Sequence, residues 1–223
     1  MPDEGKKITI RPKGPYLLRG GIPLVRKSQV MSEHGEPLSW QEEGPVEAKE
    51  TYRLCRCGQS KTKPFCDGTH TIDRFDGTQS ADTGQIADRS KTFRSPKIFI
   101  QEDHPICVHS GFCRDTVSDI WSMRRHSTDP EVLAKIIDKL DNCPSGALAY
   151  ALESGGEIIE PELAEEVVVI PDGTLWVTGG VRVERSDGQP LEIRNRVTLC
   201  RCGASSIKPL CDGTHKEIGF TDS

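Results

Sequence analysis

Nine cysteines are the residues of this 223-residue chain best suited to chemistry, and they fall into three groups of three. The groups are Cys55, Cys57 and Cys66, then Cys107, Cys113 and Cys143, and last Cys200, Cys202 and Cys211. An odd number of thiols without an export signal argues against a disulfide scaffold. Because clustered thiols in a reducing compartment usually bind metal, these spacings predict metal binding.

The first and third groups belong to an internal repeat. The segment LCRCG occurs at residues 54–58 and again at 199–203, and a segment ending in CDGTH occurs at 63–70 and again at 208–215. The offset between the copies is 145 residues throughout. Each copy offers ligands spaced C-x-C-x8-C-x3-H, which are Cys55, Cys57, Cys66 and His70 in the first copy and Cys200, Cys202, Cys211 and His215 in the second.

The spacing within each copy predicts two pairs of ligands. Residues i and i+2 of an extended segment point to the same side, so Cys55 and Cys57 form one pair. Residues i and i+4 of a helical turn share a face, so Cys66 and His70 form the other. Two pairs suit a two-iron, two-sulfide (2Fe–2S) cluster, and they equally suit a single tetrahedral zinc bound by three cysteines and one histidine. The spacing alone leaves both kinds of site open.

Both copies also satisfy a longer signature, C-x-C-x2-[S/T]-x3-P-x-C-D-G-[S/A/T]-H. The chain therefore resembles the CDGSH iron–sulfur (NEET-like) family. The resemblance implies that each quartet binds one 2Fe–2S cluster, with the histidine and the third cysteine on the outer, solvent-facing iron. Two motifs in one chain are similar to the tandem members of the family, in which the copies form an internal pseudo-dimer.

The histidine of each quartet affects the redox chemistry. Three thiolates and a neutral imidazole leave an oxidised cluster less negative than four thiolates would, so adding an electron becomes easier. The imidazole binds iron only when it is neutral, and its unperturbed pKa is about 6.5. We therefore expect a one-electron carrier or a cluster donor whose potential falls as pH rises. Arg56 and Arg201, between the paired cysteines, either stabilise the added electron or are solvated turn residues.

The middle cysteines resemble a different iron–sulfur pattern. Residues 107–113 (CVHSGFC) and the Cys-Pro at residue 143 are similar to the single-cluster ferredoxin pattern C-x2-C-x2-C…C-P, with Ser110 where the second cysteine belongs. Three thiolates suit a 3Fe–4S cluster, or a 4Fe–4S cluster with one open corner. A ferredoxin fold that has lost its cluster would also keep its thiols as small buried groups. His109 is either a substitute ligand or a surface residue.

Short strands and one helix are expected to position these ligands. Apolar runs bounded by Gly and Pro predict strands. They are residues 16–18, 22–25, 51–54 and 98–100. Asp129 followed by Pro130 predicts the start of a helix, which ends before Pro144. Its buried stripe would consist of Val132, Leu133, Ile136, Ile137 and Leu140.

The predicted fold class is α+β, with two small β-rich CDGSH modules that form an internal pseudo-dimer and an inserted ferredoxin-like α+β domain. The expected boundaries are 1–77 for the first module, 78–96 for a polar linker, 97–152 for the ferredoxin-like domain and 153–223 for the second module. The first copy carries 14 extra residues in the stretch around 31–45.

Composition narrows the classes of function. The chain has 29 Lys plus Arg against 34 Asp plus Glu, and this formal charge of −5 disfavours a general nucleic-acid binder. No apolar run reaches the roughly 18 to 20 residues of a membrane helix. Residues 1–7 have neither a secretory core nor a presequence pattern. We expect a cytoplasmic protein, monomeric or weakly homodimeric, whose partners are redox or cluster-acceptor proteins.

The sequence has no nucleophile–base constellation, phosphate-binding glycine loop or nicotinamide fingerprint, so we expect a carrier and not an enzyme. Two alternatives remain, a structural zinc-binding interaction module and a redox or sensor subunit of a larger enzyme. Iron–sulfur clusters colour a protein red-brown and zinc does not, so the colour of the protein distinguishes an iron–sulfur carrier from a zinc-binding module.

Replacing His70 or His215 with cysteine should keep a cluster, lower the potential of that site and remove its response to pH, because a thiolate replaces a ligand that can be protonated near neutrality. Redox titration of the wild type and both variants between about pH 6 and 9 tests this expectation. If the substituted site kept its proton-coupled potential, a different group would have to be the one that titrates.

Overall fold

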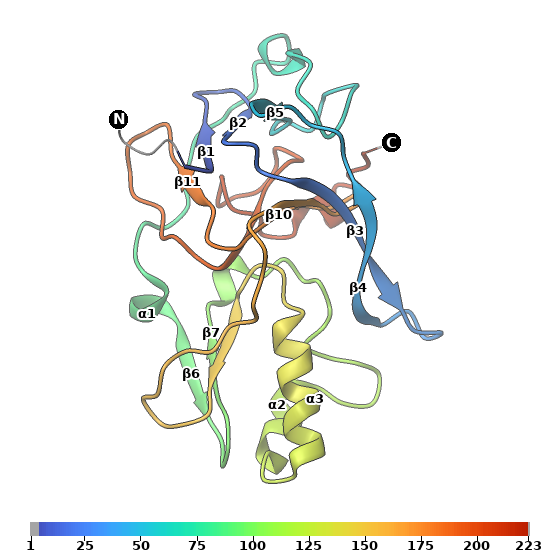
Figure 1. Ribbon diagram of the computed structural model, residues 1–223, viewed down its shortest axis with the longest axis vertical. Helices are drawn as coiled ribbons and strands as arrows, with labels where there is room; N and C mark the ends of the chain where they lie inside the picture. The colour runs from blue at the N-terminus through green and yellow to red at the C-terminus, as the bar shows by residue number, and fades with distance from the viewer. Residues whose placement is uncertain (1–4, 223) are drawn as a thin grey trace.

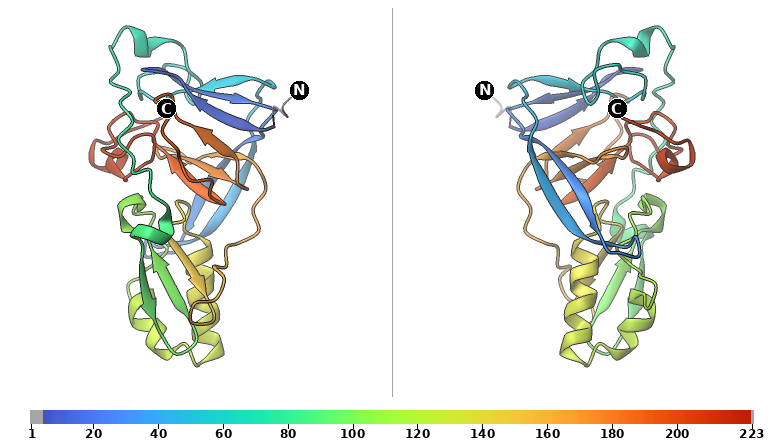
Figure 2. Two further views of the ribbon diagram at one scale, coloured as in Figure 1. Left: turned by 90° about the vertical axis from the view of Figure 1, so that its left-hand side faces the viewer. Right: turned by 90° about the vertical axis from the view of Figure 1, so that its right-hand side faces the viewer.

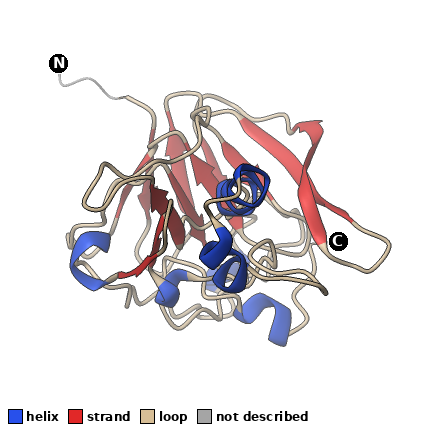
Figure 3. Cartoon of the chain, turned by 90° about the horizontal axis from the view of Figure 1, so that it is seen from below, coloured by secondary structure: helices blue, strands red, loops and turns tan. Residues whose placement is uncertain are grey.

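The computed structural model describes residues 5–222 and shows a mixed α+β fold made mostly of short strands. Two sheets form the upper body in Figure 1, and a smaller sheet with the longest helix forms the lower end. Seen from that lower end, the helices are short and few (Figure 3). Across residues 5–222, no helix is both long enough and apolar enough to cross a membrane. The predicted α+β class is therefore confirmed.

Each upper sheet combines strands from both repeats. The first sheet has the order β11-β1-β2-β5, and the second has the order β12-β10-β9-β3-β4. The strands of the first sheet are β1 (Lys7–Ile10), β2 (Tyr16–Arg19), β5 (Tyr52–Leu54) and β11 (Arg182–Glu184). Those of the second are β3 (Leu24–Met31), β4 (Pro37–Pro45), β9 (Val167–Val169), β10 (Leu175–Thr178) and β12 (Arg196–Leu199).

The two repeats exchange strands: the first copy gives the hairpin β3–β4 to the second sheet, and the second copy gives β11 to the first sheet. Strand β3 leaves the first copy and pairs in parallel with β9 of the second, with Leu24 beside Val167. Strand β11 leaves the second copy and pairs in parallel with β1 of the first. Each sheet therefore needs the other repeat, and the ranges 1–77 and 153–223 do not form two separate sheets. Local alternation predicts a strand but does not identify the distant strand that will pair with it.

The apolar interior is also shared. Tyr16 and Leu54 of the first copy are fully buried in the same core as Val167 and Leu199 of the second. Burying one large apolar side chain contributes roughly 1.5–3 kcal/mol, so a shared core links the stability of the two copies. The strands predicted at 16–18, 22–25, 51–54 and 98–100 occur, with shifted ends, as β2, β3, β5 and β7.

The central region has one antiparallel sheet, β6-β7-β8, and most of the helices. Its strands are β6 (Lys91–Arg94), β7 (Phe99–Glu102) and β8 (Leu148–Ala151). Its α-helices are α1 (Ile86–Arg89), α2 (Ile120–Met123) and α3 (Pro130–Asp141), and its 3₁₀ turns are η2 (His104–Ile106) and η3 (Arg124–His126). The CDGSH turns carry η1 (Thr69–Thr71) and α4 (Thr214–Glu217).

Helix α3 begins and ends as predicted. The Asp129 carboxylate accepts the backbone N–H of Glu131 at 2.8 Å, and Pro130 is the first helical residue. Asn142 is the C-terminal cap. Ile136 and Leu140 are completely buried, and the other three residues of the predicted stripe are partly buried against the same core.

Part of the predicted linker 78–96 is wrong. Residues 86–89 form α1, and residues 91–94 form β6, which pairs along its whole length with β7. Backbone hydrogen bonds to a neighbouring strand hold this polar segment in place, and they leave no trace in its composition. The central sheet therefore begins inside the stretch that resembles a linker.

The extra residues of the first copy form a long hairpin, in which β3 continues to Met31 and returns as β4. The ring of Trp40 lies 5.2 Å from the ring of Trp176 and 5.2 Å from that of Phe112. The Trp40 Nε1–H donates to the carbonyl oxygen of Asn142 at 3.0 Å. The hairpin thus joins the second repeat to the central region.

A buried carboxylate also connects these parts. Asp103 is fully buried, and its Oδ2 lies 2.8 Å from Arg89 Nη2 and 3.3 Å from Arg194 Nη1. Arg194 also donates to the carbonyl oxygen of Gly146. A buried charge is tolerated only with such partners, so the three side chains depend on one another.

Replacing Asp103 with alanine should lower the free energy of unfolding by roughly 3–5 kcal/mol, because two partly buried arginines, Arg89 and Arg194, lose their counter-charge. Chemical denaturation measures the effect. The control is Arg182→Ala, which removes an exposed 3.6 Å pair with Glu184 and should cost about 0–1 kcal/mol. Equal effects of the two substitutions would contradict the stabilising role of Asp103.

Candidate metal centres

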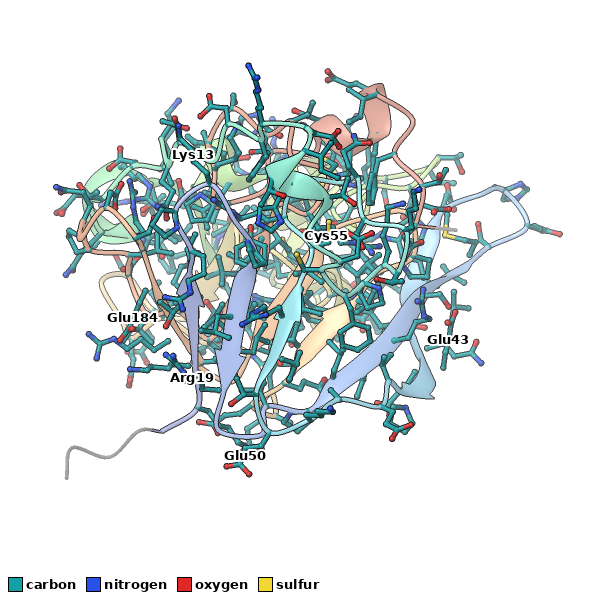
Figure 4. All side chains as sticks on the ribbon, turned by 90° about the horizontal axis from the view of Figure 1, so that it is seen from above. Lys13, Arg19, Glu43, Glu50, Cys55 and Glu184 are labelled. Atoms are coloured by element: carbon teal, nitrogen blue, oxygen red, sulfur yellow. The ribbon has the colours of Figure 1, made fainter. Side chains whose placement is uncertain are left out.

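The first quartet lies in the loop that follows β5. The backbone N–H of Cys55 donates to the carbonyl oxygen of Pro64 at 2.8 Å, and that of Cys66 donates to β5 at 3.0 Å. The Sγ atoms of Cys55 and Cys57 are 3.8 Å apart, and Cys66 Sγ is 3.4 Å from His70 Nδ1. Cys55 lies inside the upper end of the molecule (Figure 4). The structure therefore contains the two pairs that the spacing predicts.

The second quartet repeats this geometry after β12. The backbone N–H of Cys200 donates to the carbonyl oxygen of Pro209 at 2.9 Å. The Sγ atoms of Cys200 and Cys202 are 3.6 Å apart, and Cys211 Sγ is 3.4 Å from His215 Nδ1. The same short-range pairing in both copies shows that the repeated sequence makes a repeated local structure.

The separations inside the pairs fit shared metal ligation. Two sulfur atoms bound at about 2.3 Å to one tetrahedral metal lie roughly 3.8 Å apart, and a sulfur–nitrogen pair lies slightly closer. The observed separations run from 3.4 to 3.8 Å. Among the residues that the structure describes, groups of three or more His, Cys, Asp or Glu that could hold one metal ion are absent. Each quartet contains two close pairs, one of two cysteines and one of a cysteine and a histidine.

An aspartate shapes each CDGTH turn. Asp67 accepts the backbone N–H of Lys61 at 2.8 Å and that of Thr69 at 3.0 Å, and Asp212 accepts two bonds of the same kind. These bonds, led by that from Lys61, hold the pKa of Asp67 well below its usual range. The carboxylate therefore keeps the turn that presents the third cysteine and the histidine.

Arg56 and Arg201 are buried, with 1% and 2% exposure. The Nε–H of each donates to a glycine carbonyl oxygen at 2.8 Å. The guanidinium groups also lie over the rings of Phe75, at 5.0 Å, and Phe220, at 5.2 Å. Such contacts compensate a buried cation. The interpretation of these arginines as solvated turn residues is wrong.

The two C-x-C loops lie against each other. A Cβ atom added at Gly58 would be 2.5 Å from the carbonyl oxygen of Cys202, and one added at Gly203 would be 2.7 Å from that of Cys57. Both glycines also have positive φ angles, of 81° and 84°. Only glycine suits this approach, which brings the two quartets back to back.

Tyr16 crosses from the first copy into the second site. Its buried hydroxyl donates to the carbonyl oxygen of Cys200 at 2.6 Å and to that of Pro209 at 3.2 Å. Burial, together with the nearby thiol of Cys200, raises the pKa of Tyr16 well above its usual value, so the hydroxyl remains a donor. The backbone of the second quartet is therefore held by a side chain of the first repeat.

One thiol in each C-x-C pair loses its proton readily. The contact with its partner sulfur lowers the pKa of Cys55 to about 6 and that of Cys202 to about 7, against the opposing effect of burial. Backbone N–H groups of Gly58 and Ser60 add to the effect at Cys55. Because the thiolate is the form that binds metal, each pair offers a ligand near neutral pH.

The two histidines differ in their surroundings. His70 is half-buried, whereas His215 is 6% exposed. Burial, with Lys216 and Arg201 close by, lowers the pKa of His215 to about 4. The imidazole of His215 is therefore neutral near pH 7, as metal ligation requires.

The middle cysteines line one cavity of about 320 Å³. Cys107 and Cys113 come from one loop, and Cys143 comes from the end of α3. Ser110 and His109 line the same cavity, and Cys107 Sγ is 3.9 Å from His109 Nδ1. Burial raises the pKa of the Cys107 and Cys113 thiols. The fold thus brings Cys143 to the same cavity as the two thiols of one loop, Cys107 and Cys113.

Sequence reasoning missed two residues that contact the second quartet. Val108, between a cysteine and a histidine of the middle group, is buried in one apolar cluster with three cysteines of that quartet. Tyr16 corresponds to Leu175 in the second copy. A comparison of the two repeats could have singled out Tyr16, because only the first copy has a hydroxyl at this position. Val108 carries no comparable signal, because a lone valine is typical of any core.

Comparison with known families agrees with this arrangement. Residues 13–71 and 172–216 match the family described as "Iron-binding zinc finger CDGSH type". Residues 93–153, between them, match the family described as "Divergent 4Fe-4S mono-cluster". Two CDGSH segments therefore flank a divergent mono-cluster segment, and the resemblances inferred from the cysteine motifs are confirmed.

Two curated relatives share a short segment with the chain. They are the proteins named "CDGSH iron-sulfur domain-containing protein 3, mitochondrial" of Mus musculus and of Homo sapiens, each 59% identical over 27 residues. The match covers 12% of this chain and 20% and 21% of the two relatives, so the chain spans about a fifth of their length. No solved structure matches the chain.

Replacing Gly58 with alanine should lower the metal content of both quartets, because the new Cβ would displace the backbone of Cys202 in the other copy. The clash should cost roughly 1–3 kcal/mol, in addition to about 1–2 kcal/mol of left-handed backbone strain. Metal content per chain and thermal unfolding measure the two effects.

The control is Gly35→Ala at the tip of the β3–β4 hairpin. Gly35 has a φ of 76°, and a Cβ there would have open space around it among the described residues. This variant shares the backbone strain without the clash. Loss of metal from the first quartet alone in Gly58→Ala would contradict the back-to-back contact.

Proposed function

Since this chain is a CDGSH-type iron–sulfur protein with a divergent mono-cluster segment between its two CDGSH segments, we propose that it carries two 2Fe–2S clusters, one on each quartet. Three cysteines and one histidine bind each cluster in this proposal, with the C-x-C pair on one iron and the Cys–His pair on the other. The observation that carries the proposal is the division of each quartet into two pairs with ligand atoms 3.4–3.8 Å apart.

The activity that fits these sites is one-electron transfer, delivery of a cluster to acceptor proteins, or both. A bound 2Fe–2S cluster supplies the one-electron chemistry. The buried guanidinium groups of Arg56 and Arg201 offset the negative charge of the thiolates. The imidazoles of His70 and His215 would hold the outer iron, and only a neutral imidazole can bind a metal. The chain then acts as a carrier and not as an enzyme.

The two copies form an internal pseudo-dimer in this proposal. The exchanged strands β3 and β11 support it, as do the reciprocal contacts of Gly58 and Gly203. Because one chain supplies both halves, a second chain is not needed to complete either quartet. We therefore propose a monomer or weak homodimer that meets redox or cluster-acceptor proteins in the cytoplasm.

The ferredoxin-like central region would hold a third cluster. The cavity lined by Cys107, Cys113 and Cys143 supports this part of the proposal, as does the match to a mono-cluster family. Three thiolates suit a 3Fe–4S cluster, or a 4Fe–4S cluster with one open corner. Ser110, which lines the same cavity, could then supply an oxygen ligand.

A zinc-binding module is the second candidate, since the matching family description itself includes the term zinc finger. Three cysteines and one histidine are a common zinc ligand set. Zinc would leave the protein colourless and free of inorganic sulfide. The names of the two matched relatives, which contain the term iron-sulfur domain, and the match of residues 93–153 to a mono-cluster family favour the iron–sulfur proposal.

Iron and acid-labile sulfide should each exceed about four per chain if the third cluster is present, and equal about four if only the two 2Fe–2S clusters are bound. The variant with Cys107, Cys113 and Cys143 all replaced by alanine should lose the excess and keep about four of each. Chemical assays of iron and sulfide, with visible spectra, provide the counts.

A matched variant replaces the ligands of one CDGSH quartet, Cys200, Cys202, Cys211 and His215, with alanine. It should lose about two iron and two sulfide and keep the rest. Stoichiometric zinc in the wild type, with no sulfide, would contradict the proposed function.

A further inference from the structure

One loop of the central region lies directly on the second quartet. Residues 107–110 run from the central cavity to the CDGTH turn of the second repeat, residues 211–215, and to the adjacent Lys216. Val108 in this loop is 4% exposed. Val108 packs in one apolar cluster with Cys200, Cys202 and Cys211. The same short loop therefore lines the central cavity on one side and covers the second quartet on the other.

Polar and steric contacts hold this loop in place. The Lys216 side chain, one residue after His215, donates to the carbonyl oxygen of His109. Gln29 Nε2 on β3 donates to the carbonyl oxygen of Ser110 at 2.8 Å. A Cβ atom added at Gly213 would lie 3.1 Å from the His109 ring and 3.2 Å from the Val108 carbonyl oxygen. The loop is thus in close contact with the turn that carries His215.

The first quartet has a different environment. Gly68 is the counterpart of Gly213, and a Cβ added there would meet none of the described residues within 4 Å. Cys66 and His70 are half-buried, whereas their counterparts Cys211 and His215 are 1% and 6% exposed. Cys66 also lines an open hollow of about 600 Å³.

The arrangement of the whole chain explains this difference. In both views of Figure 2, the turn of the first repeat lies at the end of the molecule farthest from the central region. The turn of the second repeat lies beside the central region, in agreement with the contacts that Gly213 and Lys216 make with residues 108 and 109. The central region therefore covers the turn of the second repeat, and the contacts of Gly213 and Lys216 have no counterpart at Gly68 among the described residues.

We infer that residues 107–110 cap the second quartet and close it to solvent and to acceptor proteins, so that the first quartet is the one that serves external partners. This inference rests on the proposed function, because it assumes that both quartets hold clusters. A ligand exchanges with solvent or with an acceptor only when its outer side is accessible. His215 is only 6% exposed, and it shares a small hollow of about 130 Å³ with Val108 and Ser110 of the cap.

The test measures iron release from the holoprotein to a strong iron chelator, followed by the loss of visible absorption. The wild type should show a fast phase and a slow phase for the two quartets. Variants in which the ligands of one quartet are replaced with alanine assign each phase to a quartet. The central cavity is unchanged in these variants, so any iron that it releases is the same in each of them. The slow phase should belong to the second quartet.

Gly213→Ala and Gly68→Ala form a matched pair, because both glycines have φ angles near 90° (90° and 93°) and only Gly213 contacts the cap. Gly213→Ala should speed the slow phase about tenfold, which corresponds to ~1.4 kcal/mol. Gly68→Ala should leave the slow phase unchanged. An unchanged slow phase in Gly213→Ala, or equal release from both quartets in the wild type, would overturn the inference.

Lys216→Ala provides a second measurement that leaves the backbone of the turn untouched. It removes the contact with the His109 carbonyl oxygen and should also speed the slow phase, whereas Thr71→Ala at the corresponding position of the first repeat should not. A colourless, sulfide-free wild type would instead contradict the proposed function before any chelator is added, so the two failures are distinguishable.

Discussion

The close approach of the two C-x-C loops is the contact on which the rest of this structure depends. Gly58 and Gly203 place each loop against the backbone of a cysteine in the other copy, at distances that leave no room for a side chain. The sheets of the two repeats also interlock, because β3 pairs with β9 and β11 pairs with β1. Neither quartet is therefore an independent module.

Bringing two thiolate-rich sites together has an electrostatic cost. Like charges repel more strongly in a poorly solvated interior than in water. Arg56 and Arg201 lie beside the quartets, and burial lowers the pKa of each. The carboxylate of Asp222, and after it the Cys55 thiolate of the opposite copy, raise the pKa of Arg201. Tyr16, and after it the Cys200 thiolate of the opposite copy, do so for Arg56. A buried cation is expensive by itself, and here carbonyl oxygens and aromatic rings compensate it.

The central region breaks the symmetry of the two repeats. The hairpin β3–β4 is present in only one copy, and Trp40 on it reaches both the second repeat and the end of α3. Asp103 and Arg194 add a buried ion pair to this junction. Two sequences with the same ligands thus have different surroundings, since the same central region contacts one of them and leaves the other open.

The sequence by itself determined the features that depend on near neighbours. The ligand pairs follow from short spacings, and α3 follows from Asp129, Pro130 and an apolar stripe. Only the tertiary structure decided that β3 pairs with β9, that residues 91–94 join the central sheet, and that Arg56 is buried. These outcomes depend on groups far apart in the chain. Periodicity and composition report local preference and carry no information about which distant backbone or side chain will complete a contact.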